Sequence, residues 1–172
     1  MNTALKRLIR PGKTASDITP LLADGSAFHA VVAQLIHLAR SVTFTKVVCV
    51  EGKGFLFGAP VAHKFSAGLV PIRHPAQLQQ EFIAQTFTDF SGEAKTLAIH
   101  RDALTPDDSV IIIDDWVQTG ATLKAAIALV EQSGAGVAAI LALMDSSTDN
   151  LKTDLAPYRY QSLLKVSPDD RF

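Results

Sequence analysis

The chain has 172 residues, a length that suits one domain with a full hydrophobic core. Apolar residues make up 48% and charged residues 19% of the sequence, so we expect a globular protein and not a disordered one. The net charge of −1 gives no indication of a surface for polyanions, and we therefore expect no nucleic acid partner.

Several classes of protein and site find no support in the sequence. Cys49 is the only cysteine, so no internal disulfide can form, and its apolar neighbours predict a packing role in a buried strand. The first ten residues hold no apolar run long enough for a secretory signal, and the longest apolar stretch, residues 137–144, is too short to span a membrane. We therefore expect a cytoplasmic protein without a membrane partner. The five histidines show no metal-ligand spacing, so no residue is predicted to bind a metal directly.

The apolar pattern of the first half predicts helices and strands in alternation. Residues 26–40 place apolar side chains on one face and form an amphipathic helix with Ser26 as its N-cap. Residues 46–50 are apolar and β-branched, which indicates a buried strand. A helix over residues 55–65 and a second strand over residues 69–72 follow.

The second half continues the alternation. Residues 110–113 form the clearest strand, a helix over residues 123–132 ends before Gly134, and residues 137–144 form another buried strand. Strands that are apolar along their whole length and alternate with helices indicate an α/β fold, with a parallel sheet covered by helices on both faces. Because no linker or repeat divides the chain, we expect a single domain over residues 1–172. Ligands of such sheets bind at the carboxyl ends of the strands.

The pattern weakens between residues 73 and 109. Residues 77–92 are polar, with scattered phenylalanines and no clear period. A long irregular stretch in a compact domain is usually functional or mobile. Two interpretations stay open: a mobile flap over a site, or a surface hairpin.

The segment over residues 110–122 combines two chemical features. Its buried strand leads into two adjacent carboxylates, Asp114 and Asp115, which suit the hydroxyls of a sugar or a hydrated Mg²⁺. The loop over residues 118–122, Gln-Thr-Gly-Ala-Thr, then opens a helix, where unsatisfied backbone N–H groups and the helix dipole favour an anion. The two threonine hydroxyls of the loop add hydrogen-bond donors, and its glycine and alanine let a phosphate approach the backbone. The segment therefore predicts a phosphate site beside a sugar site.

This segment resembles the signature of the type I phosphoribosyltransferases, an apolar strand with two acidic residues and a threonine-glycine loop, and among them it is similar to the adenine phosphoribosyltransferases. Residues 17–24, 50–58 and 99–104 resemble further stretches of that family in the same order. The resemblance implies the type I phosphoribosyltransferase fold, with a small hood over the carboxyl edge of the sheet, and a homodimer.

The resemblance also implies a reaction: transfer of the phosphoribosyl group from 5-phosphoribosyl 1-pyrophosphate to a purine nucleobase, with release of pyrophosphate and with Mg²⁺ as cofactor. It assigns the ribose hydroxyls and catalysis to Asp114 and Asp115. The residues it implies for the 5-phosphate are Gln118, Thr119, Gly120, Ala121 and Thr122. Those for pyrophosphate are Gly52, Lys53, Gly54, Arg73 and His74, and those beside the base are Ala15 and Ser16.

The sequence departs from the family pattern on the pyrophosphate and base sides. Lys53 stands where the family usually has arginine, which loses the bidentate fork, and His74 stands where it has lysine. Alanine and serine at positions 15 and 16 replace the usual phenylalanine and arginine, and Asp89-Phe90 stands for the glutamate-tyrosine pair of the family's flexible loop.

Two alternatives to an adenine-type transferase stay open, and the departures motivate the first of them. One is a phosphoribosyltransferase-fold ligand sensor with weak catalysis. The other is a dinucleotide-binding oxidoreductase, since Gly52, Gly54 and Gly58 follow a strand and open a helix in loose likeness to a Rossmann fingerprint. That alternative leaves the segment over residues 110–122 unexplained.

Overall fold

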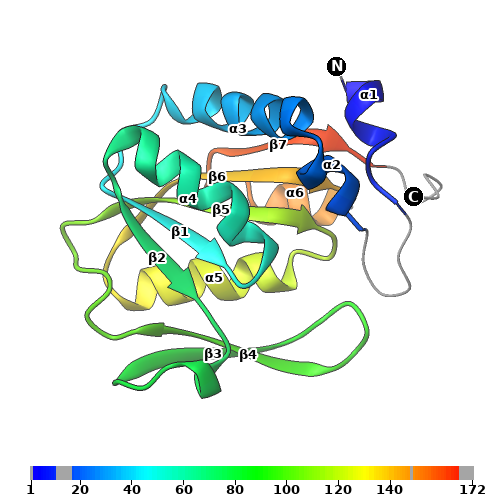
Figure 1. The fold of residues 1–172 in the computed structure, drawn as a ribbon. Helices are drawn as coiled ribbons and strands as arrows, with labels where there is room; N and C mark the ends of the chain where they lie inside the picture. Colours follow the sequence, from blue (N-terminus) through cyan, green and yellow to red (C-terminus); the bar gives the residue numbers. More distant parts are fainter. Residues whose placement is uncertain (1, 11–16, 148, 167–172) are drawn as a thin grey trace.

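The computed structural model describes residues 2–10, 17–147 and 149–166. Within these residues the chain forms a parallel sheet of five strands and an antiparallel sheet of two (Figure 1). The strand order of the large sheet is β2 (Gly68–Ile72), β1 (Lys46–Val50), β5 (Ser109–Val117), β6 (Gly136–Asp145) and β7 (Tyr160–Lys165). The predicted α/β fold with a parallel sheet is confirmed.

The strand register brings the ends of three strands together. Cys49 of β1 pairs with Ile113 of β5, so Glu51 and Asp114 follow at the same edge. On the other side of β1, Val50 pairs with Ile72 of β2. The loop after β1, the aspartates on β5 and the segment after β2 therefore meet at the carboxyl end of the sheet, where ligands of parallel sheets bind.

One face of the sheet is covered by α2 (Thr19–Ala23), α3 (Gly25–Ala39) and α4 (Lys53–Phe65), and α1 (Asn2–Lys6) lies beside β7 (Figure 1). Helix α4 is packed so closely on β1 that a Cβ at Gly58 would lie 1.8 Å from Cys49 Sγ. Cys49 is fully buried, and burial raises the pKa of its thiol to about 12. The packing role predicted for this cysteine agrees with these contacts.

The other face is covered by α5 (Ala121–Gln132) and by a hairpin of β3 (Phe82–Thr88) and β4 (Ala94–His100). The hairpin packs against α5, and the amide of Gln132 donates to the amide oxygen of Gln85 at 3.1 Å. A short 3-10 helix, η1 (Pro75–Gln77), leads into it, and α6 (Asp149–Asp154) follows β6. Of the two interpretations of residues 77–92, the hairpin is the one the structure shows; movement of this segment stays a prediction.

Several predicted boundaries were wrong. Strand β5 continues four residues beyond Ile113 to Val117, because its backbone stays paired with β6 past the two aspartates. Helices α4 and α5 each begin two residues earlier than predicted. The N-cap of α3 is Asp24, not Ser26: its carboxylate accepts the backbone N–H groups of Ser26 and Ala27, and the Ser26 hydroxyl donates to it as well. None of the described helices is long and apolar enough to cross a membrane.

Candidate active site

Asp114 and Asp115 lie in β5, next to the loop that follows β1. Asp114 is only 6% exposed, and its Oδ1 accepts the backbone N–H of Asp115 at 2.8 Å. Burial raises the pKa of Asp114 well above its usual value, and the charge of Asp115 adds to the effect. Since both residues belong to a paired strand and not to a loop, their carboxylates are held on a rigid support.

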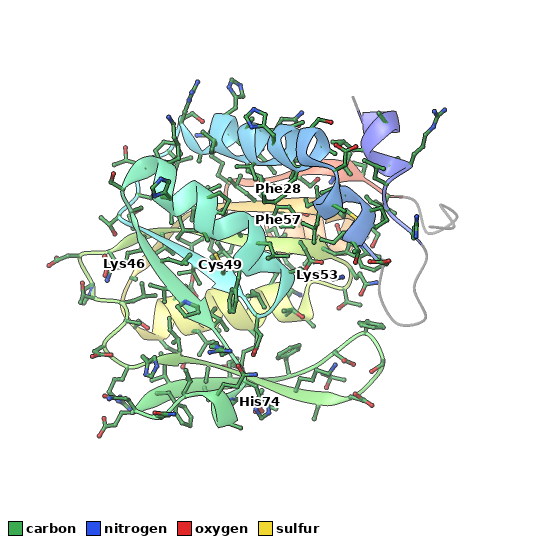
Figure 2. The ribbon with its side chains drawn as sticks, in the orientation of Figure 1. Phe28, Lys46, Cys49, Lys53, Phe57 and His74 are labelled. Atoms are coloured by element: carbon green, nitrogen blue, oxygen red, sulfur yellow. The ribbon has the colours of Figure 1, made fainter. Side chains whose placement is uncertain are left out.

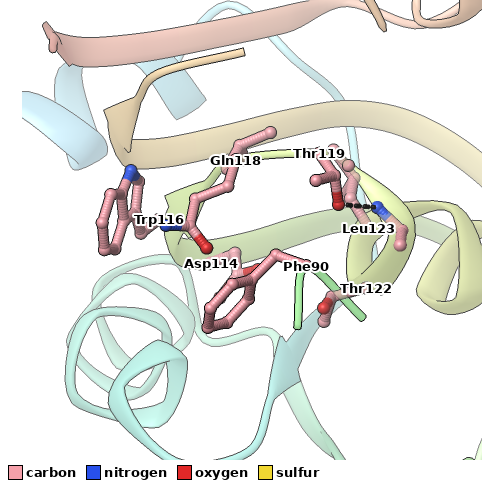
Figure 3. A pocket seen from close by; sticks show the side chains of 10 residues that line it. Phe90, Asp114, Trp116, Gln118, Thr119, Thr122 and Leu123 are labelled. Carbon is pink, nitrogen blue, oxygen red and sulfur yellow. Dashed lines mark hydrogen bonds between the residues drawn. The ribbon is translucent and has the colours of Figure 1, made fainter. Parts of the chain in front are cut away.

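The loop over residues 118–122 follows β5 and opens α5. Gly120 has φ of 79°, a conformation that favours glycine, and a Cβ there would lie 2.3 Å from Leu151 Cδ1, so the leucine side chain would have to move. The backbone N–H of Ala121 donates to the Thr119 hydroxyl at 3.3 Å. The predicted phosphate residues line one small pocket together with Asp114 (Figure 3). The structure thus brings the predicted sugar and phosphate residues to one place.

The loop after β1 carries the glycines and lysine predicted to meet pyrophosphate. Gly52 is the N-cap of α4, the Glu51–Gly52 peptide bond is cis, and Lys53 is the first residue of the helix. Gly54 lies so close to β5 that a Cβ would be 3.0 Å from the carbonyl oxygen of Ile113. Lys53 Nζ lies 3.5 Å from Asp115 Oδ2. The lysine therefore links the predicted pyrophosphate loop to the predicted sugar residues.

Arg73 and His74 follow β2 and are both tied to Glu51. The Arg73 guanidinium lies 3.6 Å from Glu51 Oε1, and the backbone N–H of His74 donates to Glu51 Oε2 at 2.8 Å. The His74 ring accepts the backbone N–H of Ala76 through Nδ1 at 3.2 Å. Figure 2 shows Lys53 at the start of α4 and His74 beside the hairpin.

An open cleft of about 480 Å³ lies beside these residues. It is lined by the end of β1, by Glu51 and His74, by Thr122, and by the hairpin residues Phe87, Ala94, Lys95, Thr96 and Leu97. The structure therefore places His74 and the phosphate-loop residue Thr122 on one cleft. Lys53 and Arg73, which were predicted to face pyrophosphate, each face a carboxylate in this structure: Asp115 and Glu51.

The structure adds Trp116, which the sequence reasoning did not mention, and brings in Phe90, which was aligned only with the family's flexible loop. Phe90 and Trp116 line the same pocket as Asp114 (Figure 3). Phe90 reaches it because Asp89 closes the hairpin turn: its carboxylate accepts the backbone N–H groups of Ser91 and Glu93 and pairs with Lys95 at 2.6 Å. The hydrogen bonds from Lys95 and Ser91 hold the pKa of Asp89 below its usual value. Ala15 and Ser16, predicted beside the base, lie outside the described residues.

Residues 23–170 match the phosphoribosyl transferase domain. The chain belongs to the phosphoribosyltransferase family. Adenine phosphoribosyltransferase of Roseiflexus castenholzii is 40% identical over 155 residues, which cover 90% of both chains. The corresponding protein of Shewanella denitrificans is 41% identical over 128 residues, which cover 74% of this chain and 69% of the relative.

Solved structures place this phosphoribosyltransferase in the same group. The adenine phosphoribosyltransferase of Thermoanaerobacter pseudethanolicus superposes with a TM-score of 0.87 at 32% identity, over 96% of this chain and all of that one. That of Rhodothermus marinus gives 0.84 at 30% identity, over 95% and 97% of the two chains. The predicted family, the type I phosphoribosyltransferase fold with its small hood, and the enzyme class are confirmed. The dinucleotide-binding alternative does not fit this family.

Proposed function

We propose that the protein transfers the phosphoribosyl group of 5-phosphoribosyl 1-pyrophosphate to adenine and releases pyrophosphate. The observation that carries the proposal is the Asp114–Asp115 pair, of which Asp114 is buried and Asp115 half-buried, and which β5 holds beside the phosphate loop at the start of α5. The names of the relatives support adenine as the base. So does the enzyme of Saccharomyces cerevisiae, 26% identical, which was solved with adenine and an imino-altritol bisphosphate.

The sugar side follows from the aspartate pair. Because burial raises its pKa, the Asp114 carboxyl can donate a hydrogen bond to a ribose hydroxyl when it is protonated and accept one when it is ionised. The backbone amides at the start of α5 hold the 5-phosphate. Two fixed points on one rigid strand and its following loop orient the anomeric carbon, and such orientation supplies much of the catalysis.

In the reaction the bond between the anomeric carbon and pyrophosphate breaks, and its electron pair leaves with pyrophosphate. The lone pair of the base nitrogen forms the new bond, and the proton that this nitrogen loses passes to solvent water. Gly52, Gly54, Lys53, Arg73 and His74 are the groups we assign to the departing charge. Lys53 and Arg73 must first turn from Asp115 and Glu51 toward it.

Mg²⁺ fits this site as a partner of the substrate. Among the described residues, no three His, Cys, Asp or Glu side chains gather as a metal site of their own. Mg²⁺ is usually bound by one or two carboxylates together with substrate phosphates, and Asp115 and Glu51 offer hard oxygen atoms at this edge. The ion would supply positive charge to the pyrophosphate.

The remaining expectations complete the proposal. The protein acts as one domain over residues 1–172, forms a homodimer and works in the cytoplasm. Ala15 and Ser16 stay assigned to the base side by the resemblance alone, because both lie outside the described residues.

The decisive experiment is turnover with a panel of purine and pyrimidine bases, phosphoribosyl pyrophosphate and Mg²⁺, with nucleotide and pyrophosphate measured separately. We expect adenine to give equal amounts of its nucleotide and of pyrophosphate. Tight binding of phosphoribosyl pyrophosphate without turnover of any base would refute the proposed transferase activity and favour the ligand sensor. The comparisons do not support that alternative.

A further inference from the structure

Three side chains in the pocket beside Asp114 are not needed for a phosphate site built from backbone amides. They are Phe90 from the hairpin turn, Trp116 from the end of β5 and Gln118 from the loop that follows (Figure 3). The phosphate role of the loop uses backbone amides, so the side chain of Gln118 is available for another partner.

Both aromatic residues line the pocket. The Trp116 ring is fixed, because its Nε1–H donates to the Ser146 hydroxyl at 3.0 Å and the ring packs against the core. Phe90 is 52% exposed, although it is a large apolar residue, and the hydrogen bonds of Asp89 set its position at the turn. Aromatic side chains that line a pocket are the usual stacking partners of a nucleobase.

Gln118 places an amide next to these rings. Its side chain extends from the loop toward Asp114 and Trp116 (Figure 3). Within the described part of the chain, no hydrogen bond engages this amide. A glutamine amide carries a donor and an acceptor in one plane. The half-buried amide therefore has capacity to pair with a ligand that offers the complementary pattern.

We propose that Gln118 is a specificity-determining residue that pairs with the base edge bearing N7 and the 6-amino group, while Trp116 and Phe90 contact the ring faces. Adenine offers an acceptor at N7 and a donor at the 6-amino group, which match the two halves of the amide. A 6-oxo purine offers acceptors at both places, so one half of the amide would face an acceptor with no proton between them. This inference rests on the proposed function, because it assumes that the ribose is held at Asp114 and Asp115.

The test compares the 6-amino and 6-oxo nucleotides as product inhibitors. Q118M keeps the length of the side chain but removes both hydrogen-bonding groups. We expect inhibition by adenosine monophosphate to weaken about 5- to 150-fold, the range of one bidentate pair, while inhibition by inosine monophosphate changes little. The kcat/KM for adenine should fall by the same factor, mainly through KM. Q132M is the matched control, since it makes the same change on α5, where the Gln132 amide bonds only to Gln85 on the surface among the described residues.

A second variant separates stacking from edge recognition. F90A should weaken both nucleotides about 5- to 150-fold, the range of base stacking on an aromatic ring, and leave their ratio unchanged. Thermal melting of each variant checks that it folds.

The outcomes distinguish this inference from the function on which it rests. A wild-type protein that does not convert adenine refutes the proposed function itself. If wild type converts adenine but Q118M keeps the wild-type preference for the 6-amino nucleotide, Gln118 does not read the base. Equal weakening of both nucleotides in Q118M would assign Gln118 to the phosphoribosyl group and overturn the inference.

Discussion

The substitution Asp114→Asn separates what this residue does for the reaction from what it does to the fold. Asp114 is held at 6% exposure beside a second carboxylate, which raises its pKa. A group whose pKa is raised on folding destabilises the fold when it is ionised, that is, above its folded pKa. Asparagine keeps the acceptor for the Asp115 N–H and carries no charge. We therefore expect the variant to be more stable near neutral pH and to lose affinity for phosphoribosyl pyrophosphate.

The expected gain is about 0.5–2 kcal/mol, the usual range of one stabilising substitution. It should be full above the folded pKa of Asp114. It should shrink as pH falls toward the usual value of 3.8, where the carboxyl group is protonated in both the folded and the unfolded protein. Urea denaturation of both proteins at several values between about pH 5 and pH 8 measures the difference in the free energy of unfolding.

Asp108, near the opposite end of β5, supplies a control of opposite sign. Burial alone would raise its pKa, but hydrogen bonds from Lys46 and Thr45 hold it below the usual value. Asp108→Asn should therefore lose stability at neutral pH. A loss of stability in Asp114→Asn at neutral pH, or a gain that grows as pH falls, would refute the claim that the buried Asp114 carboxylate destabilises the fold.

Three further predictions concern ligands. Replacing Asp114 and Asp115 together by asparagine should abolish binding of phosphoribosyl pyrophosphate, and unchanged affinity by calorimetry would contradict the assignment. His74→Lys should tighten pyrophosphate binding more at about pH 8 than at about pH 6, because lysine stays charged where histidine is mostly neutral; an identical pH dependence in both proteins would remove His74 from the site. Hydrogen exchange in residues 77–92 should slow when ligand and Mg²⁺ are added, as expected of a segment that closes over substrate, and equal rates would show that it does not respond.

The parts of the fold that the sequence predicted well are those where burial is complete. Strands such as β1 are apolar at nearly every position, because both faces of the sheet are covered. Strand β7 was missed, since it lies at the sheet edge and mixes Tyr, Gln, Ser and Lys with two leucines. Strand β3 was predicted only as part of the hairpin alternative, without bounds, because its alternation of exposed and half-buried residues leaves no strongly apolar run.

The same distinction applies to the site. Asp114 and the loop over residues 118–122 are contiguous, so their chemistry could be predicted from the order of residue types alone. Phe90 reaches the pocket only through the packing of the hairpin on α5, and the links from Glu51 to Arg73 and His74 depend on strand order. No local pattern encodes such contacts, which arise when distant segments meet.

The contact between Lys53 and Asp115 affects how strongly the enzyme binds intact phosphoribosyl pyrophosphate compared with pyrophosphate or ribose 5-phosphate alone. The pair is 3.5 Å long and its side chains are 36% and 18% exposed, so opening it costs about 1 kcal/mol or less. Pyrophosphate alone would draw the lysine away and leave the aspartate without its cation, and ribose 5-phosphate alone would do the reverse. Only a molecule that carries both pyrophosphate and ribose gives Lys53 and Asp115 a new partner each when their contact opens. The enzyme should therefore hold the intact donor more tightly than either fragment, which favours release of the separated products.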